Sequence, residues 1–147
     1  MEEDKEKGKD NKNKTKKLLP VIVCITAVAI AVFVSLSGGN KTNNQIIQES
    51  VKDLKNSVKL PAQVDEITTL MDITPQDNAV RYHYTLSTKE DISDITNEGI
   101  KESLKENICK DTQILDLLKK GINLEYLYKV ENSNQEYFVT FTYSDCL

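Results

Sequence analysis

Apolar residues follow three patterns along this 147-residue chain: one unbroken run, three stretches with helical spacing and four with alternating spacing. The unbroken run is LLPVIVCITAVAIAVFVSL, residues 18–36, and none of its 19 residues is charged. At about 1.5 Å of rise per residue, a helix of this length covers roughly 28 Å, close to the ~30 Å hydrocarbon core of a bilayer. The pattern predicts one transmembrane helix.

Lysines beside this run predict its orientation. Five lysines precede it closely, at positions 9, 12, 14, 16 and 17, whereas only Lys41 follows soon after it. Cytoplasmic flanks are enriched in Lys and Arg, so we expect the N-terminus inside the cell. The chain is then a single-pass protein of the inner (cytoplasmic) membrane. It contacts the lipid bilayer through residues 18–36, and its C-terminal domain is periplasmic or extracellular.

A secretory signal peptide has the same order of basic and apolar residues. Ser35-Leu36-Ser37 before Gly38 supplies small residues where a signal peptidase cuts. Against cleavage, the apolar run is longer than the roughly 7 to 15 residues of a usual signal core. A retained signal-anchor is therefore the main interpretation, and a cleaved secreted or periplasmic protein is the alternative.

Three stretches beyond the run have helical periodicity. The first begins near Asn44, a candidate N-cap, and ends before Pro61. The second begins after Ser93, and the third begins at the candidate N-cap Asp111 and stops at Gly121. Their apolar stripes are Ile46, Ile47, Val51, Leu54 and Val58; Ile95, Ile100, Leu104 and Ile108; and Ile114, Leu115, Leu117 and Leu118.

Four stretches alternate apolar and polar residues, as strands with one buried face do: residues 64–73, 79–86, 122–130 and 137–143. Polar turns join them into two hairpins. The order helix, hairpin, helices, hairpin predicts an α+β two-layer sandwich, with a four-stranded antiparallel sheet and two to three helices across one face. The apolar faces are Ile67, Met71 and Ile73; Val80, Tyr82, Tyr84 and Leu86; Ile122, Leu124, Tyr126, Tyr128 and Val130; and Tyr137, Val139, Phe141 and Tyr143.

These patterns divide the chain into a disordered cytoplasmic tail (1–17), the span (18–36), a linker (37–44) and one exported domain (45–147). The tail contains seven lysines and five acidic residues with almost nothing apolar to bury. Beyond the span, eighteen acidic residues outnumber twelve basic ones. Such a domain should repel nucleic acid, so we expect no nucleic-acid partner.

Cysteine usage agrees with an exported domain. Cys24 lies within the span, which leaves Cys109 and Cys146 as a pair that an oxidising compartment would join. Two free buried thiols or a redox-active pair are the alternatives. Neither cysteine belongs to a Cys-x-x-Cys motif, which argues against redox catalysis.

Catalytic chemistry has little support. The single histidine, His83, lies between Arg81 and Thr85 on the strand face opposite Tyr82 and Tyr84. Spacing identifies no nucleophile and no orienting carboxylate for it, and no second metal ligand. We therefore predict no catalytic residue, metal site or cofactor. Arg81, His83 and Thr85 form a possible binding surface, while the tyrosine-bearing face is either core or a second binding surface.

A sparse pattern of core, turn and cysteine positions extends over residues 60–147. The pattern comprises Leu60-Pro61, Val64-Asp65, Tyr82-x-Tyr84, Cys109, Gly121, Tyr126-x-Tyr128, Phe138 to Phe141 and Asp145-Cys146. It resembles small exported, membrane-anchored bacterial domains of uncharacterised function. The resemblance implies a shared scaffold, the disulfide and an envelope location, and it transfers no catalytic residue.

Two classes of function fit these observations. The first is a membrane-tethered, non-enzymatic binding or assembly module of the bacterial cell envelope, which acts on an envelope protein partner through its exported domain. The second is an envelope enzyme, a hydrolase, whose site the sequence does not reveal.

Overall fold

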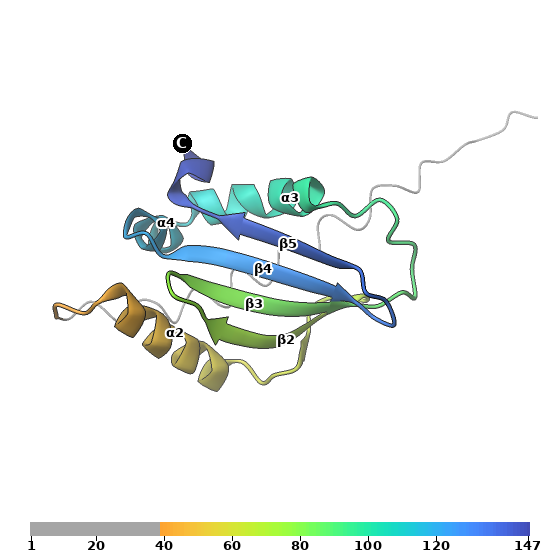
Figure 1. Cartoon of the computed structure of the whole chain (residues 1–147), viewed down its shortest axis with the longest axis horizontal. Helices are drawn as coiled ribbons and strands as arrows, with labels where there is room; N and C mark the ends of the chain where they lie inside the picture. Colours follow the sequence, from red (N-terminus) through yellow and green to blue (C-terminus); the bar gives the residue numbers. More distant parts are fainter. Residues whose placement is uncertain (1–38) are drawn as a thin grey trace, which may run out of the picture.

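One sheet with helices on a single face makes up the part of the chain that this computed structural model describes, residues 39–147 (Figure 1). The predicted tail and span, and the possible cleavage site before Gly38, lie outside the described residues. Within residues 39–147, no helix combines the length and the apolar character needed to cross a membrane. The elements are α2 (Asn43–Ser57), β1 (Ala62–Gln63), β2 (Thr68–Pro75), β3 (Ala79–Leu86), α3 (Asn97–Lys110), α4 (Thr112–Lys119), β4 (Asn123–Val130), β5 (Glu136–Phe141) and the short 3-10 helix η3 (Tyr143–Cys146).

The sheet has five strands in the order β1-β2-β3-β4-β5 and is mixed. The α+β class and the two hairpins, β2–β3 and β4–β5, are confirmed. The prediction of a four-stranded antiparallel sheet was wrong in two respects. Strands β3 and β4 pair in parallel, and the two-residue strand β1 adds a fifth strand at one edge. Helices α3 and α4 connect β3 to β4 and return the chain to the end of the sheet where β3 began. Such a crossover makes the joined strands parallel.

Side-chain caps set where the helices begin. Thr42, rather than Asn44, caps α2: its hydroxyl accepts from the amide of Gln45, whose side chain accepts from the amide of Thr42 in return. The predicted cap Asp111 is confirmed, since its carboxylate accepts two amides of the first turn of α4. Gly121 follows α4 with a φ of +80°, a conformation that favours glycine.

Helix α3 starts later than the apolar periodicity after Ser93 predicts. Thr96 is the N-cap of α3, and its hydroxyl accepts from the amide of Gly99. The stretch from Ser93 to Ile95 therefore precedes the helix, although Ile95 still packs against the core. A cap decides this boundary because its side chain satisfies amides that have no partner within the helix.

The tyrosine-bearing face of the sheet is core. Tyr82 stacks on Tyr126 with ring centroids 5.3 Å apart, and Tyr84 stacks on Tyr128 at 4.7 Å. Helix α2 packs against β2 and β3, α3 against β5, and α4 against β4, so all three cover this one face. Tyr143 is the exception, because it lies in η3 and is exposed. The remaining large buried side chains include Ile47, Leu54, Leu70, Ile73, Leu86, Leu104, Ile108, Leu118, Ile122 and Phe141.

A bulge in β2 reverses the predicted position of one residue. Leu70 pairs with Tyr84 and Asp72 pairs with the next residue of β3, His83, so Met71 is extra. The bulge shifts the alternation by one position: Leu70 is buried, whereas Met71 is 46% exposed. The prediction that Met71 belongs to the core was therefore wrong.

The predicted disulfide is present between Cys109 and Cys146, whose Cα atoms lie 5.3 Å apart. It joins the last turn of α3 to η3 at the end of the chain. Asp145 beside it forms an ion pair with Lys101 of α3, at 2.7 Å. Burial raises the pKa of Asp145, but this ion pair and hydrogen bonds from Thr142 outweigh it and hold the pKa below its ordinary value.

Candidate functional site

The face of the sheet opposite the helices is the candidate site, and we call it the open face. In β3, β4 and β5 its residues alternate with the buried residues of the core. Figure 1 shows the long strands with no helix in front of them, α2 beside β2 and α3 beside β5. The open face consists of Thr69, Met71, Asp72, Thr74, Arg81, His83, Thr85, Glu125, Leu127, Lys129, Glu136, Phe138 and Thr140.

The predicted binding residues Arg81, His83 and Thr85 all lie on this face, in the central strand β3. Three apolar residues of the face were missed, namely Met71, Leu127 and Phe138. A signal for two of them was present, because Leu127 and Phe138 occupy outward positions that are otherwise polar in their strands. The exposure of Met71 depends on the bulge, which alternation along β2 alone does not predict.

Two ion pairs neutralise charges on the open face. The guanidinium of Arg81 binds Glu125 of the adjacent strand, with 2.7 Å between Nε and Oε2. The same guanidinium lies over the ring of Phe138, 5.3 Å from its centroid. Lys55 of α2 binds Asp72 at 2.7 Å and lowers the pKa of that carboxyl. These pairs leave few charges on the face without an opposite charge nearby.

His83 is partly buried in the middle of the open face. Its Nε2 forms a hydrogen bond of 2.7 Å with the hydroxyl of Thr74. Burial lowers the pKa of His83, and the positive charges of Arg81, Lys129 and Lys55 lower it further, while Asp72 opposes them. The imidazole is therefore neutral at pH 7, and it offers a hydrogen-bonding group rather than a charge.

The lowered pKa of His83 predicts a stability change in mild acid. The unfolded chain, with a histidine pKa of about 6.5, binds a proton before the folded chain does. The contribution of His83 to the free energy of unfolding should therefore be constant above about pH 7.5 and decrease as the pH falls through 6.5. His83→Gln should remove this part of the decrease, which urea unfolding of both proteins at pH 7.5 and 5.5 would measure. Equal decreases in the two proteins would contradict the prediction.

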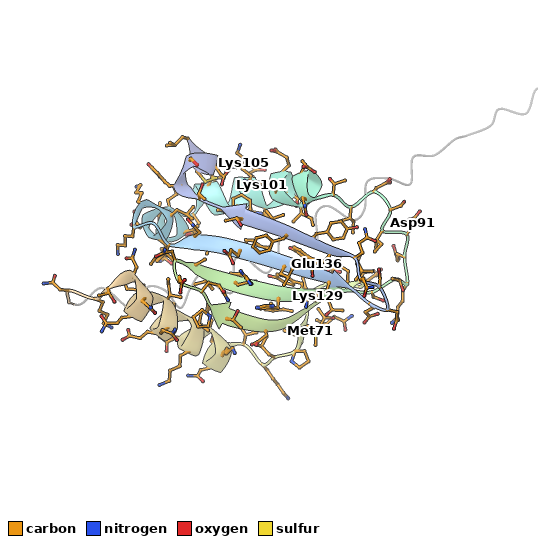
Figure 2. All side chains as sticks on the ribbon, viewed as in Figure 1. Met71, Asp91, Lys101, Lys105, Lys129 and Glu136 are labelled. Carbon is orange, nitrogen blue, oxygen red and sulfur yellow. A yellow bond between two sulfur atoms is a disulfide. The ribbon has the colours of Figure 1, made fainter. Side chains whose placement is uncertain are left out.

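Two exposed apolar side chains lie at opposite sides of the open face. Met71 of β2 is 46% exposed and Phe138 of β5 is 43% exposed, with the partly buried Leu127 between them. Figure 2 labels Met71 on β2, together with the charged residues Lys129 and Glu136 of the same face. Large apolar side chains grouped on an uncovered sheet are typical of an interaction surface.

On the outer sides of β5 and β2, one backbone amide of each strand is already bonded to a side chain. The amide of Phe138, on the outer side of β5, donates to the Asn97 side chain at 3.0 Å. At the other edge the amide of Ile73 donates to the carboxylate of Asp72 at 2.8 Å. Adding a partner strand at either edge would displace these side chains. The arrangement favours contact through the face.

The described residues contain no group of three or more His, Cys, Asp or Glu side chains placed to hold a metal ion. The chemistry that the open face does offer is recognition: apolar contact, hydrogen bonds from threonine hydroxyls and an imidazole, and paired charges.

Fold and site together define a two-layer α+β domain with helices on one sheet face and a binding-type surface on the other. The chain belongs to the family described as a domain of unknown function, DUF8479, whose model matches residues 45–138. This agrees with the uncharacterised family predicted from the sequence. The match ends before Asp145-Cys146 and so does not include that part of the pattern. Among curated proteins, no match is found.

Three solved structures share the fold. A protein of Pseudomonas aeruginosa described as secreted is similar with a TM-score of 0.59 and 17% identity, over 74% of this chain and 100% of that one. The type 2 secretion system pilotin EpsS of Vibrio vulnificus has a TM-score of 0.56 and 17% identity, over 71% and 92%. The type II secretion system pilotin AspS of Vibrio cholerae has a TM-score of 0.56 and 14% identity, over the same shares.

Proposed function

We propose that this protein is a membrane-tethered, non-enzymatic binding or assembly module of the bacterial cell envelope, and that it binds an envelope protein through the open face. The observation that carries the proposal is an uncovered sheet face with two exposed apolar residues, Met71 and Phe138. Protein interfaces combine apolar contacts with polar surroundings. The threonines and paired charges of the open face would form the polar surroundings.

Three further observations support an envelope location. The disulfide between Cys109 and Cys146 suits an oxidising compartment. The apolar run of residues 18–36 suits an anchor in the inner membrane, with the N-terminus in the cytoplasm. The structural neighbours include two pilotins of type 2 secretion systems, and we extend to this chain only the idea of an accessory module in the envelope.

Complementation of a deletion strain would test the proposal. Met71→Lys/Phe138→Lys should fold, insert and lose function, because replacing both exposed apolar contacts with lysines should weaken binding by at least about tenfold. Tyr143→Lys is the matched control, since Tyr143 is also exposed but lies outside the open face. A free exported domain without residues 1–36 should also lose function.

His83→Ala separates binding from catalysis. If the domain is a binder, this variant should function normally, because contacts on a sheet face are spread over many side chains and one partly exposed residue rarely dominates. If the domain is a hydrolase with His83 as general base, turnover should decrease about a hundredfold or more. A folded, membrane-inserted and inactive His83→Ala protein, beside an active Met71→Lys/Phe138→Lys protein, would overturn the proposed function.

A further inference from the structure

We propose that the envelope partner of the open face is a second copy of this chain, with the two sheets packed face to face about a two-fold axis. The inference rests on the proposed function and identifies the partner. A two-fold interface uses the same surface patch on both copies, so the patch must complement itself. The strand registers allow this condition to be examined residue by residue.

The open face is organised as three rows that cross the four long strands. Neighbours in each row are paired by the strand registers. In strand order β2, β3, β4 and β5, the first row is Thr74, Arg81, Glu125 and Thr140; the middle row is Asp72, His83, Leu127 and Phe138; and the third row is Thr69, Thr85, Lys129 and Glu136. The extra residue Met71 lies beside Asp72, at the β2 end of the middle row.

An axis parallel to the strands, between β3 and β4, keeps each row against the same row of the second copy. It places β2 opposite β5 and β3 opposite β4. In the first row, Arg81 then faces Glu125 of the second copy, and Glu125 faces Arg81 of the second copy. The single Arg81–Glu125 ion pair of each copy is thereby joined to the same pair of the second copy, which makes a four-charge cluster across the interface.

The same rotation covers both exposed apolar residues. Phe138 of the second copy comes to lie over Asp72 and the adjacent Met71, and the symmetry repeats this contact at the other side of the face. Contacts between a methionine sulfur and an aromatic ring are favourable. Leu127 faces His83 of the second copy at the centre. The rotation thus gives each exposed apolar residue an apolar partner.

Charge also selects the open face over other surfaces for contact between copies. Beyond the span the chain has eighteen acidic and twelve basic residues, so two copies repel each other in most orientations. On the open face, Asp72, Glu125 and Glu136 are nearly balanced by Arg81 and Lys129, and Lys55 pairs with Asp72. Two copies can therefore meet there without the repulsion that opposes other contacts.

The size of the face predicts a weak dimer that depends on the anchor. At about 4.8 Å between strands and 3.3 Å per residue, the three rows cover on the order of 400 Å² per copy. That area is below the roughly 800 Å² per partner of a standard stable interface. Anchoring both copies in one membrane raises their effective concentration and would compensate for the small area.

Site-directed cross-linking of the full chain in membranes tests the arrangement. One preparation carries Cys24→Ala/Met71→Cys and a second, differently tagged, carries Cys24→Ala/Phe138→Cys. A short bismaleimide is the probe, because facing sheets lie about 10 Å apart, too far for a disulfide. Co-expressed, the two variants should cross-link to each other, with several-fold higher yield than either variant alone.

A matched control pair lies off the open face: Asp91→Cys in the loop before α3 and Lys105→Cys on α3, both labelled in Figure 2. This pair should not cross-link when co-expressed.

Charge reversal gives a second measurement. The cross-link should decrease when both copies carry Arg81→Glu, and also when both copies carry Glu125→Arg. Co-expression of one variant with the other should restore the cross-link, because the charges that face each other across the axis are then again opposite.

The possible results separate this inference from the proposed function. No cross-link between positions 71 and 138, although a monofunctional maleimide labels both cysteines, would overturn the second copy as partner. Cross-linking of Phe138→Cys to a different envelope protein would overturn it too, while retaining the proposed function. If no partner is captured and Met71→Lys/Phe138→Lys complements fully, both proposals fail.

Discussion

Replacing Phe141 with alanine should lower the free energy of unfolding by about 3 to 5 kcal/mol. Phe141 is fully buried at the end of β5. Its ring packs edge to face against the ring of Tyr126, with 6.0 Å between the centroids, and the ammonium group of Lys101 lies over the ring of Phe141. Truncation removes the apolar area of the ring and leaves a cavity that close-packed neighbours do not fill. Domains of this size have a total stability of about 5 to 15 kcal/mol, so the loss is a large fraction of it.

Phe138 provides a matched control for Phe141, because it is the same residue type in the same strand on the opposite face. Its side chain is 43% exposed, and Phe138→Ala should cost less than about 1 kcal/mol. Urea unfolding followed by circular dichroism would measure both variants. Similar losses for the two would contradict the exposed position of Phe138 in the folded domain.

Loss of the disulfide is the second large effect that we expect. Cys146→Ala should lower the free energy of unfolding by about 2 to 5 kcal/mol. The bond closes a loop with a sequence separation of 37 residues, for which the chain-entropy relation gives about 3.8 kcal/mol. It also ties η3 to α3, so the end of the chain should become more accessible to proteases.

Reduced wild-type protein is the control for Cys146→Ala. Both should unfold at about the same urea concentration, below that of the oxidised protein, because each lacks the same covalent link. Mass spectrometry of the unreduced domain should show two hydrogen atoms fewer than the free dithiol. Two alkylated cysteines outside residues 18–36, without prior reduction, would contradict the disulfide.

Strand pairing shows where sequence reasoning reached its limit. Alternation in residues 79–86 and 122–130 predicted both strands and placed their tyrosines on one face, either core or a binding surface. It did not predict that these strands are neighbours and parallel. A parallel and an antiparallel arrangement of these two strands bury the same side chains. Which of the two forms depends on the path that α3 and α4 take across the sheet between the strands.

The candidate site was predicted only in part, because alternation describes one strand and not its pairing with another. Arg81, His83 and Thr85 follow from the alternation of one strand, which places them opposite Tyr82 and Tyr84. Met71 does not, because the bulge against Tyr84 and His83 shifts the alternation of β2. A bulge is a property of two paired strands, and the sequence of one strand does not specify it.

Local periodicity was enough to predict the three helical stretches and the four long strands, and cysteine position was enough to favour the pair Cys109 and Cys146. That the tyrosine-bearing face is core follows only from the helices packed on it. Tertiary structure alone decided the mixed sheet, the fifth strand, the bulge and the grouping of Met71, Leu127 and Phe138 on one uncovered face. The physical reason is that strand order and register arise from contacts between segments far apart in the chain, and period-two alternation is the same for every order in which those segments pair.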